Sequence, residues 1–284
     1  MNSTNALYIV ATPIGNLGDI SQRAIDTLNK ADIIAAEDTR HSAKLLQHFG
    51  IDTRVLPYHD HSNEAQTAKW LQRLQQGENV ALISDAGTPL ISDPGYRLVR
   101  LAREQGIAVI PIPGACAVVA ALSAAGLPSD RFSFEGFLPA KNTARFSRLD
   151  AVATDSRTLI FYESPHRIQD SITAMAEVFG PDRQVVMARE ISKTYETFLS
   201  ATFAELLQIL DTDPNQVRGE MVVMVQGYVA PEKEGDTLSD DVEKMMAVLM
   251  DELPLKQAAA IGAKLSGEKK NRLYKWAVEN KTER

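Results

Sequence analysis

The first half of the chain alternates short apolar runs with segments of helical periodicity. The runs are rich in β-branched residues and are apolar at successive positions, which predicts parallel strands buried on both faces. The predicted strands are Leu7–Ala11, Asp32–Ala36, Val55–Tyr58, Asn79–Ser84 and Ile107–Ile110. Helices are predicted over 19–30, 40–49, 63–76 and 95–105. Asp19 is expected to cap the first helix, and Asn63 with Gln66 has capping-box spacing at the third.

The pattern changes after Leu127-Pro128. Further strands are predicted at Phe132–Phe137, Thr158–Tyr162, Arg183–Ala188, Tyr195–Ala201 and Glu220–Gln226, with helices at Pro165–Phe179 and Phe203–Leu210. The segment Arg189–Tyr195 lies between two strands and predicts a hairpin, so the second sheet is expected to be mixed. A boundary within 111–127 divides the α/β part into domains 1–115 and 116–230.

A third module is predicted over 231–284, where the charge pattern is asymmetric. Residues 232–252 hold eight acidic and two basic side chains, whereas residues 256–284 hold eight basic and three acidic ones. Two helices broken near Ser266-Gly267 indicate a helix-turn-helix-like unit that contacts nucleic acid, or else a solvated amphipathic tail. The basic residues of the second helix are Lys269, Lys270, Arg272 and Lys275. Its expected core is Ala258, Ala259, Ile261, Leu265, Leu273, Trp276 and Ala277.

Composition narrows the protein class. Apolar residues make up 44% and charged residues 24% of the 284 residues, which is typical of a globular chain and excludes a disordered or collagen-like one. The single cysteine, Cys116, excludes an internal disulfide and fits the cytoplasm. No basic stretch precedes the first apolar run, so no secretory signal is expected. The longest weakly polar segment, Ala115 to Leu127, is too short to span a bilayer, so no membrane partner is expected either. The net charge of −7 means that any RNA contact must come from a local basic patch.

Three loops rich in glycine and proline follow predicted parallel strands. They are Thr12–Asp19, Ser84–Gly95 and Pro111–Ala117. Open α/β sheets bind ligands at the carboxyl ends of their strands, so these loops predict a ligand site. None contains a Walker lysine or a G-x-G-x-x-G pattern, which argues against a nucleoside triphosphate or NAD. The alternative is that the loops are tight turns that only connect strands.

Charged side chains near the same sheet edge suggest further roles. Asp38 either caps the next helix or joins a polar cluster in which Arg40 reaches a phosphate. His59 is expected to face a substrate, and no metal is expected because no further ligand lies at a suitable spacing. A basic groove for RNA phosphates is predicted from Arg40, Lys141, Arg145, Arg148 and Arg167. Tyr58, Phe137 and Tyr195 either stack on a base or belong to the core.

Several motifs together resemble the tetrapyrrole methylase superfamily. They are Thr12-Pro-Ile-Gly-Asn-Leu-Gly-Asp19, Glu37-Asp-Thr-Arg40, Ser84–Gly95, Phe161-Tyr-Glu-Ser-Pro-His-Arg167 and Gly219-Glu220. Within the superfamily they closely resemble the bacterial enzymes that methylate a cytidine ribose 2′-oxygen of small-subunit (16S) ribosomal RNA at the decoding centre. The resemblance covers about residues 6 to 228. It implies two α/β domains of the class III methyltransferase type, a helical tail, a homodimer, and S-adenosylmethionine held between the domains.

The resemblance also implies a set of binding residues. Those expected to contact S-adenosylmethionine are Gly15, Asp85, Gly87, Thr88, Pro89, Ile91, Gly114, Ala115, Cys116, Ala117, Tyr162 and Met221. Two departures from the family pattern stand out. The first loop lacks the Gly-Pro-Gly core of the tetrapyrrole enzymes, which argues against a corrinoid or haem precursor as substrate. Cys116 stands where many relatives have serine, which argues against a side-chain hydroxyl contact at this position.

Methyl transfer to a ribose hydroxyl needs alignment and a proton acceptor. The candidate bases are Asp38, His59 and Glu190, and Lys193 with a lowered pKa is a further one. Arg40, Lys141, Arg145, Arg167 and Lys193 are expected to bind the RNA substrate, either free ribosomal RNA or the 30S particle; no DNA partner is expected. Two alternatives remain: a methylase of a tetrapyrrole or another small molecule, and a non-catalytic RNA-binding relative.

Overall fold

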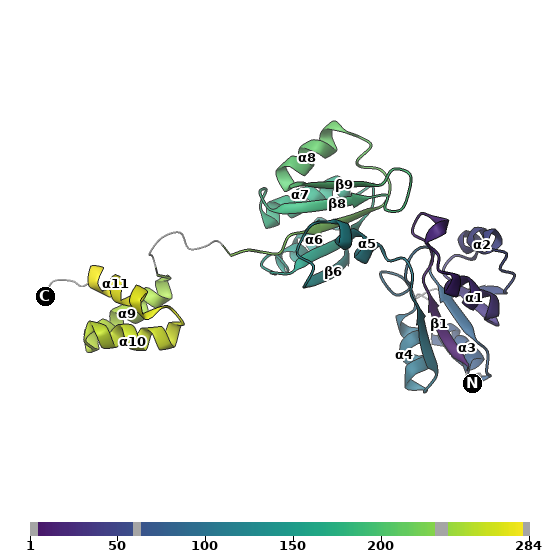
Figure 1. The fold of residues 1–284 in the computed structure, drawn as a ribbon, viewed down its shortest axis with the longest axis horizontal. Coiled ribbons are helices and arrows are strands. Elements are labelled where there is room, and N and C mark those ends of the chain that lie inside the picture. Colours follow the sequence, from purple (N-terminus) through teal and green to yellow (C-terminus); the bar gives the residue numbers. More distant parts are fainter. Residues whose placement is uncertain (1–4, 59–63, 231–237, 281–284) are drawn as a thin grey trace. The chain divides into compact units, whose positions relative to one another are not determined.

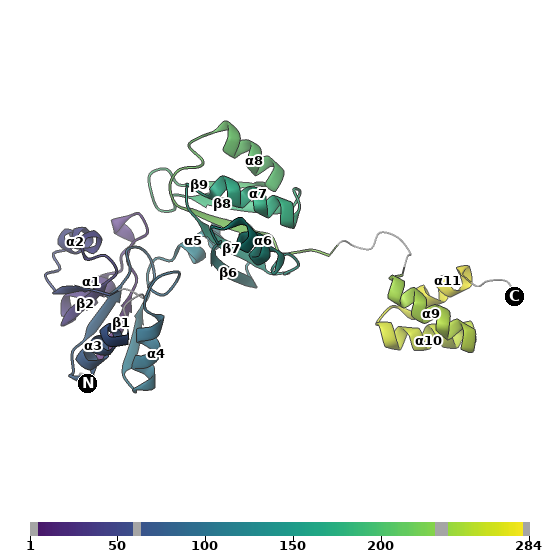
Figure 2. The ribbon, with the colours of Figure 1, turned by 180° about the vertical axis from the view of Figure 1, so that it is seen from behind.

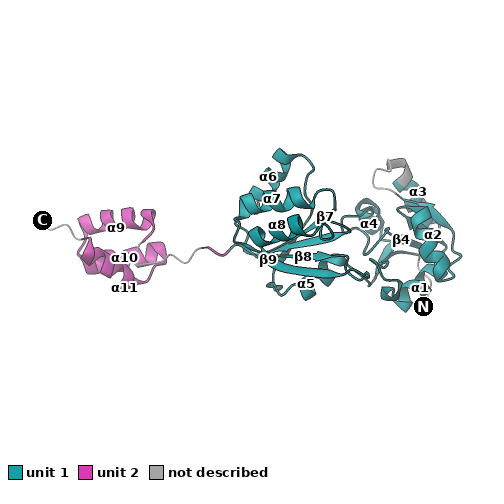
Figure 3. Ribbon diagram, turned by 90° about the horizontal axis from the view of Figure 1, so that it is seen from above, with its two compact units in different colours: residues 1–228 teal, residues 229–284 magenta. Residues whose placement is uncertain are grey.

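The computed structural model describes residues 5–58, 64–230 and 238–280 of the chain. Residues 1–228 form one compact unit and residues 229–284 form another (Figure 3). The first unit contains two five-stranded sheets. No helix in the described ranges is long and apolar enough to cross a membrane.

The first sheet is entirely parallel, with the strand order β3-β2-β4-β1-β5. Figures 1 and 2 show this sheet and its helices in purple to blue. Its strands are β1 (Ala6–Val10), β2 (Ile33–Ala36), β3 (Val55–Pro57), β4 (Val80–Ile83) and β5 (Ala108–Ile112). The helices are α1 (Gln22–Lys30), α2 (Thr39–His48), α3 (Glu64–Gln75) and α4 (Tyr96–Glu104). Successive strand residues enter two cores, one packed under α3 and α4 and one under α1 and α2. The predicted parallel sheet, covered on both faces, is confirmed.

The second sheet is mixed, as predicted, with the order β6-β7-β10-β8-β9. Only β6 and β7 pair in parallel; the other pairs are antiparallel, and the hairpin between β8 and β9 is confirmed. Its strands are β6 (Phe132–Phe137), β7 (Thr158–Glu163), β8 (Gln184–Arg189), β9 (Thr197–Thr202) and β10 (Met221–Val225). Helices α6 (Asn142–Asp150), α7 (Ile168–Phe179) and α8 (Phe203–Thr212) cover one face, and α5 (Ala117–Ala124) covers the other (Figure 3).

Helix α5 connects the two sheets. It follows β5 of the first sheet, yet its residues Val118, Ala121 and Leu122 pack on the second. The pattern of the sequence did not predict this helix, because an almost uniformly apolar segment has no amphipathic periodicity. The predicted division at residues 115 and 116 assigns α5 to the sheet it covers. That division stays a prediction, since residues 1–228 form one compact unit.

The expected cap of α1 is wrong. Asp19 lies in a 3-10 turn (Leu17–Asp19), and the side chain of Ser21 accepts the hydrogen bond from Ala24 N instead. Ser21 takes the extended backbone conformation that a capping residue requires. The capping-box pair at the start of α3 lies partly outside the described residues, because Asn63 is not described.

The second unit has three described helices where two were expected. They are α9 (Asp240–Glu252), α10 (Leu255–Ser266) and α11 (Lys270–Glu279). The unpredicted α9 begins in the acidic tract. Three acidic side chains in its first turn stabilise it, because they interact favourably with the positive end of the helix dipole. The break at Gly267 is confirmed, with glycine in the left-handed conformation. The prediction that Ile261 and Leu265 belong to the core is wrong, because their exposed fractions are 39% and 67%.

Candidate functional site

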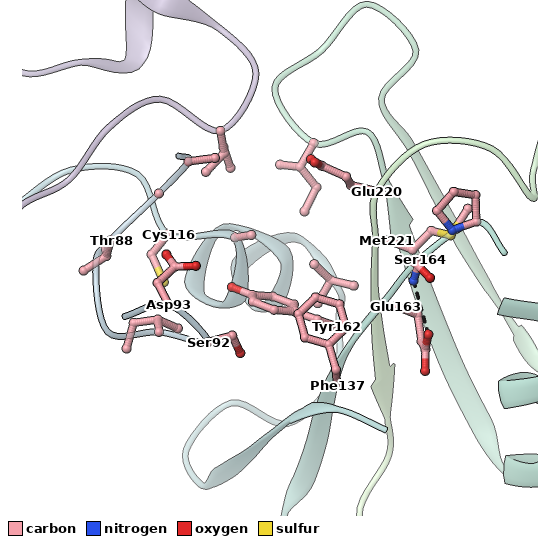
Figure 4. Close-up of a pocket in the computed structure, with 18 of the residues that line it drawn as sticks. Thr88, Ser92, Asp93, Cys116, Phe137, Tyr162, Glu163, Ser164, Glu220 and Met221 are labelled. Carbon is pink, nitrogen blue, oxygen red and sulfur yellow. Dashed lines mark hydrogen bonds between the residues drawn. The ribbon is translucent and has the colours of Figure 1, made fainter. Parts of the chain in front are cut away.

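A cavity of about 500 Å³ lies in the first unit, where loops of the first sheet face strand ends of the second (Figure 4). We call it the central pocket. Its lining comes from the loops after β1, β4, β5 and β7, from the start of α5, from β6, β7 and β10 with the residue before β10, and from the β8–β9 loop. The residues are Ile14, Ala86, Gly87, Thr88, Ile91, Ser92, Asp93, Cys116, Ala117, Phe137, Tyr162, Glu163, Ser164, Pro165, His166, Ile191, Glu220, Met221 and Val222.

The three glycine- and proline-rich loops are hydrogen-bonded to one another. Thr12 N donates to Gly87 O over 2.8 Å, and Gly87 N donates back to Thr12 O over 3.1 Å. The Thr88 hydroxyl donates to Ala115 O over 2.9 Å. Gly114 leaves no room for a side chain, since a Cβ there would lie 2.8 Å from Ala11 Cβ. These bonds make the loops one cross-linked wall of the pocket rather than three independent turns.

Unusual backbone conformations surround the pocket. The described non-glycine residues with positive φ are Leu90, Ser92, Glu190 and Ser192. Two of them lie in the loop after β4, and two lie in the β8–β9 loop that supplies Ile191. Such conformations cost about 1–3 kcal/mol each and persist only when the surrounding structure holds them, which is common at functional sites.

The opposite wall is aromatic. The ring of Tyr162 on β7 makes edge contacts with Phe134 and Phe137 of β6, at centroid distances of 4.9 and 5.5 Å. Burial raises the pKa of the Tyr162 hydroxyl, although a hydrogen bond with the backbone of Val118 opposes the rise. That bond places the hydroxyl at the first turn of α5. Tyr162 is therefore a neutral, fixed side of the pocket at any physiological pH.

Asp93 is a pocket residue that the sequence analysis quoted within a motif but did not select. Its side chain projects into the cavity near Cys116 and Thr88 (Figure 4). Burial raises the pKa of this carboxyl, and the Asp85 carboxylate adds to the rise against a hydrogen bond with Ser84. A signal was present in the sequence, because Asp93 lies within the longest motif, Ser84–Gly95. The direction of its side chain depends on the left-handed backbone of Leu90 and Ser92, which only the structure shows.

A charged network forms the rim. Lys193 Nζ lies 2.9 Å from Glu190 Oε1 and 2.9 Å from Glu220 Oε2. Burial opposes the charge on Lys193, but its hydrogen bonds to the two carboxylates outweigh burial and raise its pKa. The pKa of Lys193 is therefore raised and not lowered, which argues against a role as the base. Burial likewise opposes ionisation of Glu190, yet hydrogen bonds from Lys193 and from Glu220 N lower its pKa.

The structure gathers most of the residues expected to bind the methyl donor. Those that line the central pocket are Gly87, Thr88, Ile91, Cys116, Ala117, Tyr162 and Met221. The others lie in the loops behind this wall: Gly15, Asp85, Pro89, Gly114 and Ala115. Gly15 touches the rim instead, since the side chain of Lys193 occupies the space of its missing Cβ. The roles of all these residues stay predictions.

The candidate bases are not pocket-lining residues in the described part of the chain. Asp38 caps α2, where its carboxylate accepts from Arg40 N and His41 N. These bonds lower the pKa of the Asp38 carboxyl, and the bond from Arg40 N has the largest effect. The backbone N–H of Asp38 donates to Asp85 Oδ1 over 3.1 Å, which links the cap to the loop after β4. His59 lies outside the described residues. Glu190 stands at the rim, beside Ile191.

The predicted phosphate ligands occupy different environments. Arg40 is exposed and 3.8 Å from Asp38, and Lys141 is exposed at the start of α6. Arg145 is buried and donates to Pro139 O and Ala140 O. Arg167 donates to Leu138 O and lies 3.5 Å from the buried Glu163 carboxylate. Both arginines thus hold the loop between β6 and α6, and their phosphate contacts stay predictions.

The aromatic candidates separate by exposure. Tyr58 is buried in the core of the first sheet, beside Trp70. Phe137 is 53% exposed and lines the pocket, and Tyr195 is 72% exposed on the β8–β9 loop. Phe137 and Tyr195 therefore remain available for stacking on a base. Within the described ranges, no group of three or more His, Cys, Asp or Glu side chains is placed to hold a metal ion.

Comparison with known proteins adds an independent line of argument. The family Tetrapyrrole (Corrin/Porphyrin) Methylases matches residues 6–207, and the RsmI C-terminal HTH domain matches residues 236–281. The chain is 55% identical over 277 residues to the Ribosomal RNA small subunit methyltransferase I of Pseudomonas aeruginosa, with 98% of each chain covered. It is 55% identical over 278 residues to the protein of that name from Escherichia coli O157:H7, covering 98% of this chain and 96% of the other.

Solved structures agree on the fold. Diphthine synthase superimposes with a TM-score of 0.61 at 16% identity, covering 80% of this chain and 92% of that one. Cobalt precorrin-4 methyltransferase, a cobalamin biosynthetic enzyme, superimposes with a TM-score of 0.58 at 20% identity, covering 78% and 94%. Since the family match covers most of its length and the high-identity relatives nearly all of it, the chain belongs to the tetrapyrrole (corrin/porphyrin) methylase family.

Proposed function

We propose that this protein transfers a methyl group from S-adenosylmethionine to the ribose 2′-oxygen of a cytidine in small-subunit (16S) ribosomal RNA, at the decoding centre. The observation that carries the proposal is 55% identity, over nearly the whole length, to proteins named Ribosomal RNA small subunit methyltransferase I. The HTH match in the tail supports an RNA substrate. The position and the ribose oxygen come from the motif resemblance.

The central pocket suits S-adenosylmethionine as the methyl donor. An adenosyl group needs apolar and aromatic walls, which Ile91, Tyr162 and Met221 would supply. The turn at Gly87 and Thr88 would hold the amino-acid end. No lysine or arginine is among the described lining residues, which suits a cation and not a triphosphate. The donor supplies an electrophilic methyl group on a positively charged sulfur.

The chain has three tasks in the reaction. As the new O–CH₃ bond forms, the C–S bond breaks, its electron pair stays on sulfur, and the hydroxyl proton leaves. The cross-linked loops would hold the donor, and the aromatic wall would exclude water. Asp38, His59 and Glu190 remain the candidate proton acceptors. With its lowered pKa, Glu190 would be ionised at neutral pH, so it would accept a proton only as the hydroxyl becomes acidic.

RNA binding would use the exposed cations and the tail. Arg40 and Lys141 are exposed, and the predicted basic side chains of α11 lie in a unit separate from the pocket. Lysine and arginine contacts to phosphate give affinity without reading sequence. We further propose a cytoplasmic homodimer, which light scattering would test as twice the mass of one chain.

A methyl-transfer assay tests the function directly. Purified protein, labelled S-adenosylmethionine and 30S subunits from cells that lack this protein are combined, and the label is mapped by nuclease digestion. Label on one cytidine 2′-oxygen is the expected result. Binding of the donor without label on any ribosomal RNA would instead favour a small-molecule methylase. Tight RNA binding with no donor binding would favour a non-catalytic relative.

A further inference from the structure

The central pocket contains a carboxylate without a cationic partner. Three acidic residues line the described pocket: Asp93, Glu163 and Glu220. Glu163 is buried against Ser171 and Arg167, and Glu220 pairs with Lys193. Asp93 has no salt bridge in the described part of the chain, and its identified partner is the Ser84 hydroxyl. Its charge therefore remains uncompensated.

The backbone holds Asp93 in this place. Leu90 and Ser92, just before it, both have left-handed backbone conformations. Helix α4 begins three residues after it, at Tyr96. Asp93 and Cys116 both interact electrostatically with the Tyr162 hydroxyl, so the three groups lie close together. A fixed carboxylate beside a thiol, a neutral phenol and apolar walls is poorly solvated, so it favours a cation in the cavity.

We propose that Asp93 is the counter-ion of the donor's sulfonium and makes the pocket prefer S-adenosylmethionine over its product, S-adenosylhomocysteine. The inference rests on the proposed function. S-adenosylmethionine carries a positive sulfur, and methyl transfer leaves a neutral thioether. The two ligands share the adenosyl, ammonium and carboxylate groups. A carboxylate that acts on the sulfur therefore attracts the donor, and this attraction ends when the methyl group leaves, which promotes product release.

Binding measurements with Asp93→Asn test the proposal. Calorimetry on the full chain would use S-adenosylmethionine, S-adenosylhomocysteine and sinefungin, which has a protonated amine near the position of the sulfonium. We expect the variant to bind the two cationic ligands about tenfold more weakly and the product within about twofold of wild type. Asp26→Asn is the matched control, because Asp26 is an exposed carboxylate on α1 outside the pocket lining.

Two results would overturn the proposal. Equal loss of donor and product would assign Asp93 to the shared ammonium or to the fold, and unchanged affinities would show that its charge is not used. A wild-type protein that binds neither ligand would reject the donor pocket itself, and that outcome is distinct from the other two.

The wild type provides a second measurement that needs no variant. Acidification through the pKa of Asp93 should lower the affinity for donor relative to product, and a constant ratio would contradict this.

Discussion

Asp93 combines an unfavourable environment with a position in the pocket wall. Burial raises its pKa, so the ionised carboxylate is less stable in the folded chain than in the unfolded one. Its contribution to the free energy of unfolding is fully present below the pKa that it has in the unfolded chain. This contribution is lost as the pH rises through the higher pKa that it has in the folded chain. Residues that oppose folding in this way persist when function requires them.

Asp93→Asn should therefore keep or raise the stability of the ligand-free protein at pH 7, while weakening donor binding. The neutral amide avoids the burial cost of the charge and can still bond to Ser84. Thermal unfolding of both proteins between pH 4 and pH 8 measures the effect. The difference in Tm should vanish at the acid end, where Asp93 is protonated. The prediction would be contradicted if the Tm of the variant fell below that of wild type at pH 7 but not at pH 4.

Cys116 offers a second prediction at this scale, because it is the chain's single cysteine and lines the pocket. Bound S-adenosylmethionine should cover the thiol. At a donor concentration of 100 times Kd, alkylation should slow about 100-fold, since only the unoccupied fraction reacts. Mass spectrometry follows the modification, with Cys116→Ser as the unlabelled control. Donor binding that leaves the alkylation rate unchanged would place the donor elsewhere.

At the scale of elements, the pocket is made by loops that bond to each other across the sheet edge. The loops after β1 and β4 exchange backbone hydrogen bonds at Thr12 and Gly87, and the Thr88 hydroxyl reaches the loop after β5. Helix α5 continues from that last loop and packs on the second sheet. The pocket wall and the connection between the sheets are therefore one continuous structure.

Thr88→Arg should abolish donor binding without unfolding the chain. The long side chain would enter a cavity of about 500 Å³ that the donor needs. Loss of the hydrogen bond to Ala115 O should cost about 1 kcal/mol of unfolding free energy. Calorimetry and thermal unfolding measure both effects. Thr88→Ser keeps the hydroxyl and is the matched control. Unchanged donor affinity in the arginine variant would show that this turn does not border the binding site.

At the scale of the whole molecule, the chain divides into two units with separate cores. Residues 1–228 contain both sheets and the central pocket, and α9, α10 and α11 share their own core. The pocket needs no residue from the second unit among its described lining. A protein with this organisation can separate methyl-donor binding from RNA binding.

A chain ending at residue 230 should bind S-adenosylmethionine within about twofold of the full chain. Its RNA affinity should fall. The slope of log binding constant against log salt concentration should become less steep by about 0.7 to 0.9 for each lost phosphate contact. Filter binding to 30S subunits at several salt concentrations measures this. Loss of donor binding would make the tail part of the catalytic unit, and unchanged RNA binding would remove its proposed role.

Much of the fold could be read from local pattern. Runs such as Val80–Ile83 are apolar at successive positions because helices cover both sheet faces, and that alone indicates parallel strands. Helix α5 could not be read in this way, since its apolar surface has no polar face to mark a period. The cap at Ser21 was missed because Asp19 is an equally good capping residue, and only the 3-10 turn decides between them.

The sequence by itself determined the class of fold, the loops that form the site and the family resemblance, because these depend on residue type and spacing along the chain. Tertiary structure decided what each charged side chain does. Arg145 and Arg167 bind backbone carbonyls, and Lys193 is paired with two carboxylates. Of the three acidic residues that line the described pocket, Asp93 is the one that has no salt bridge in the described part of the chain. The physical reason is that charge, burial and hydrogen bonding depend on neighbours brought together from distant parts of the chain.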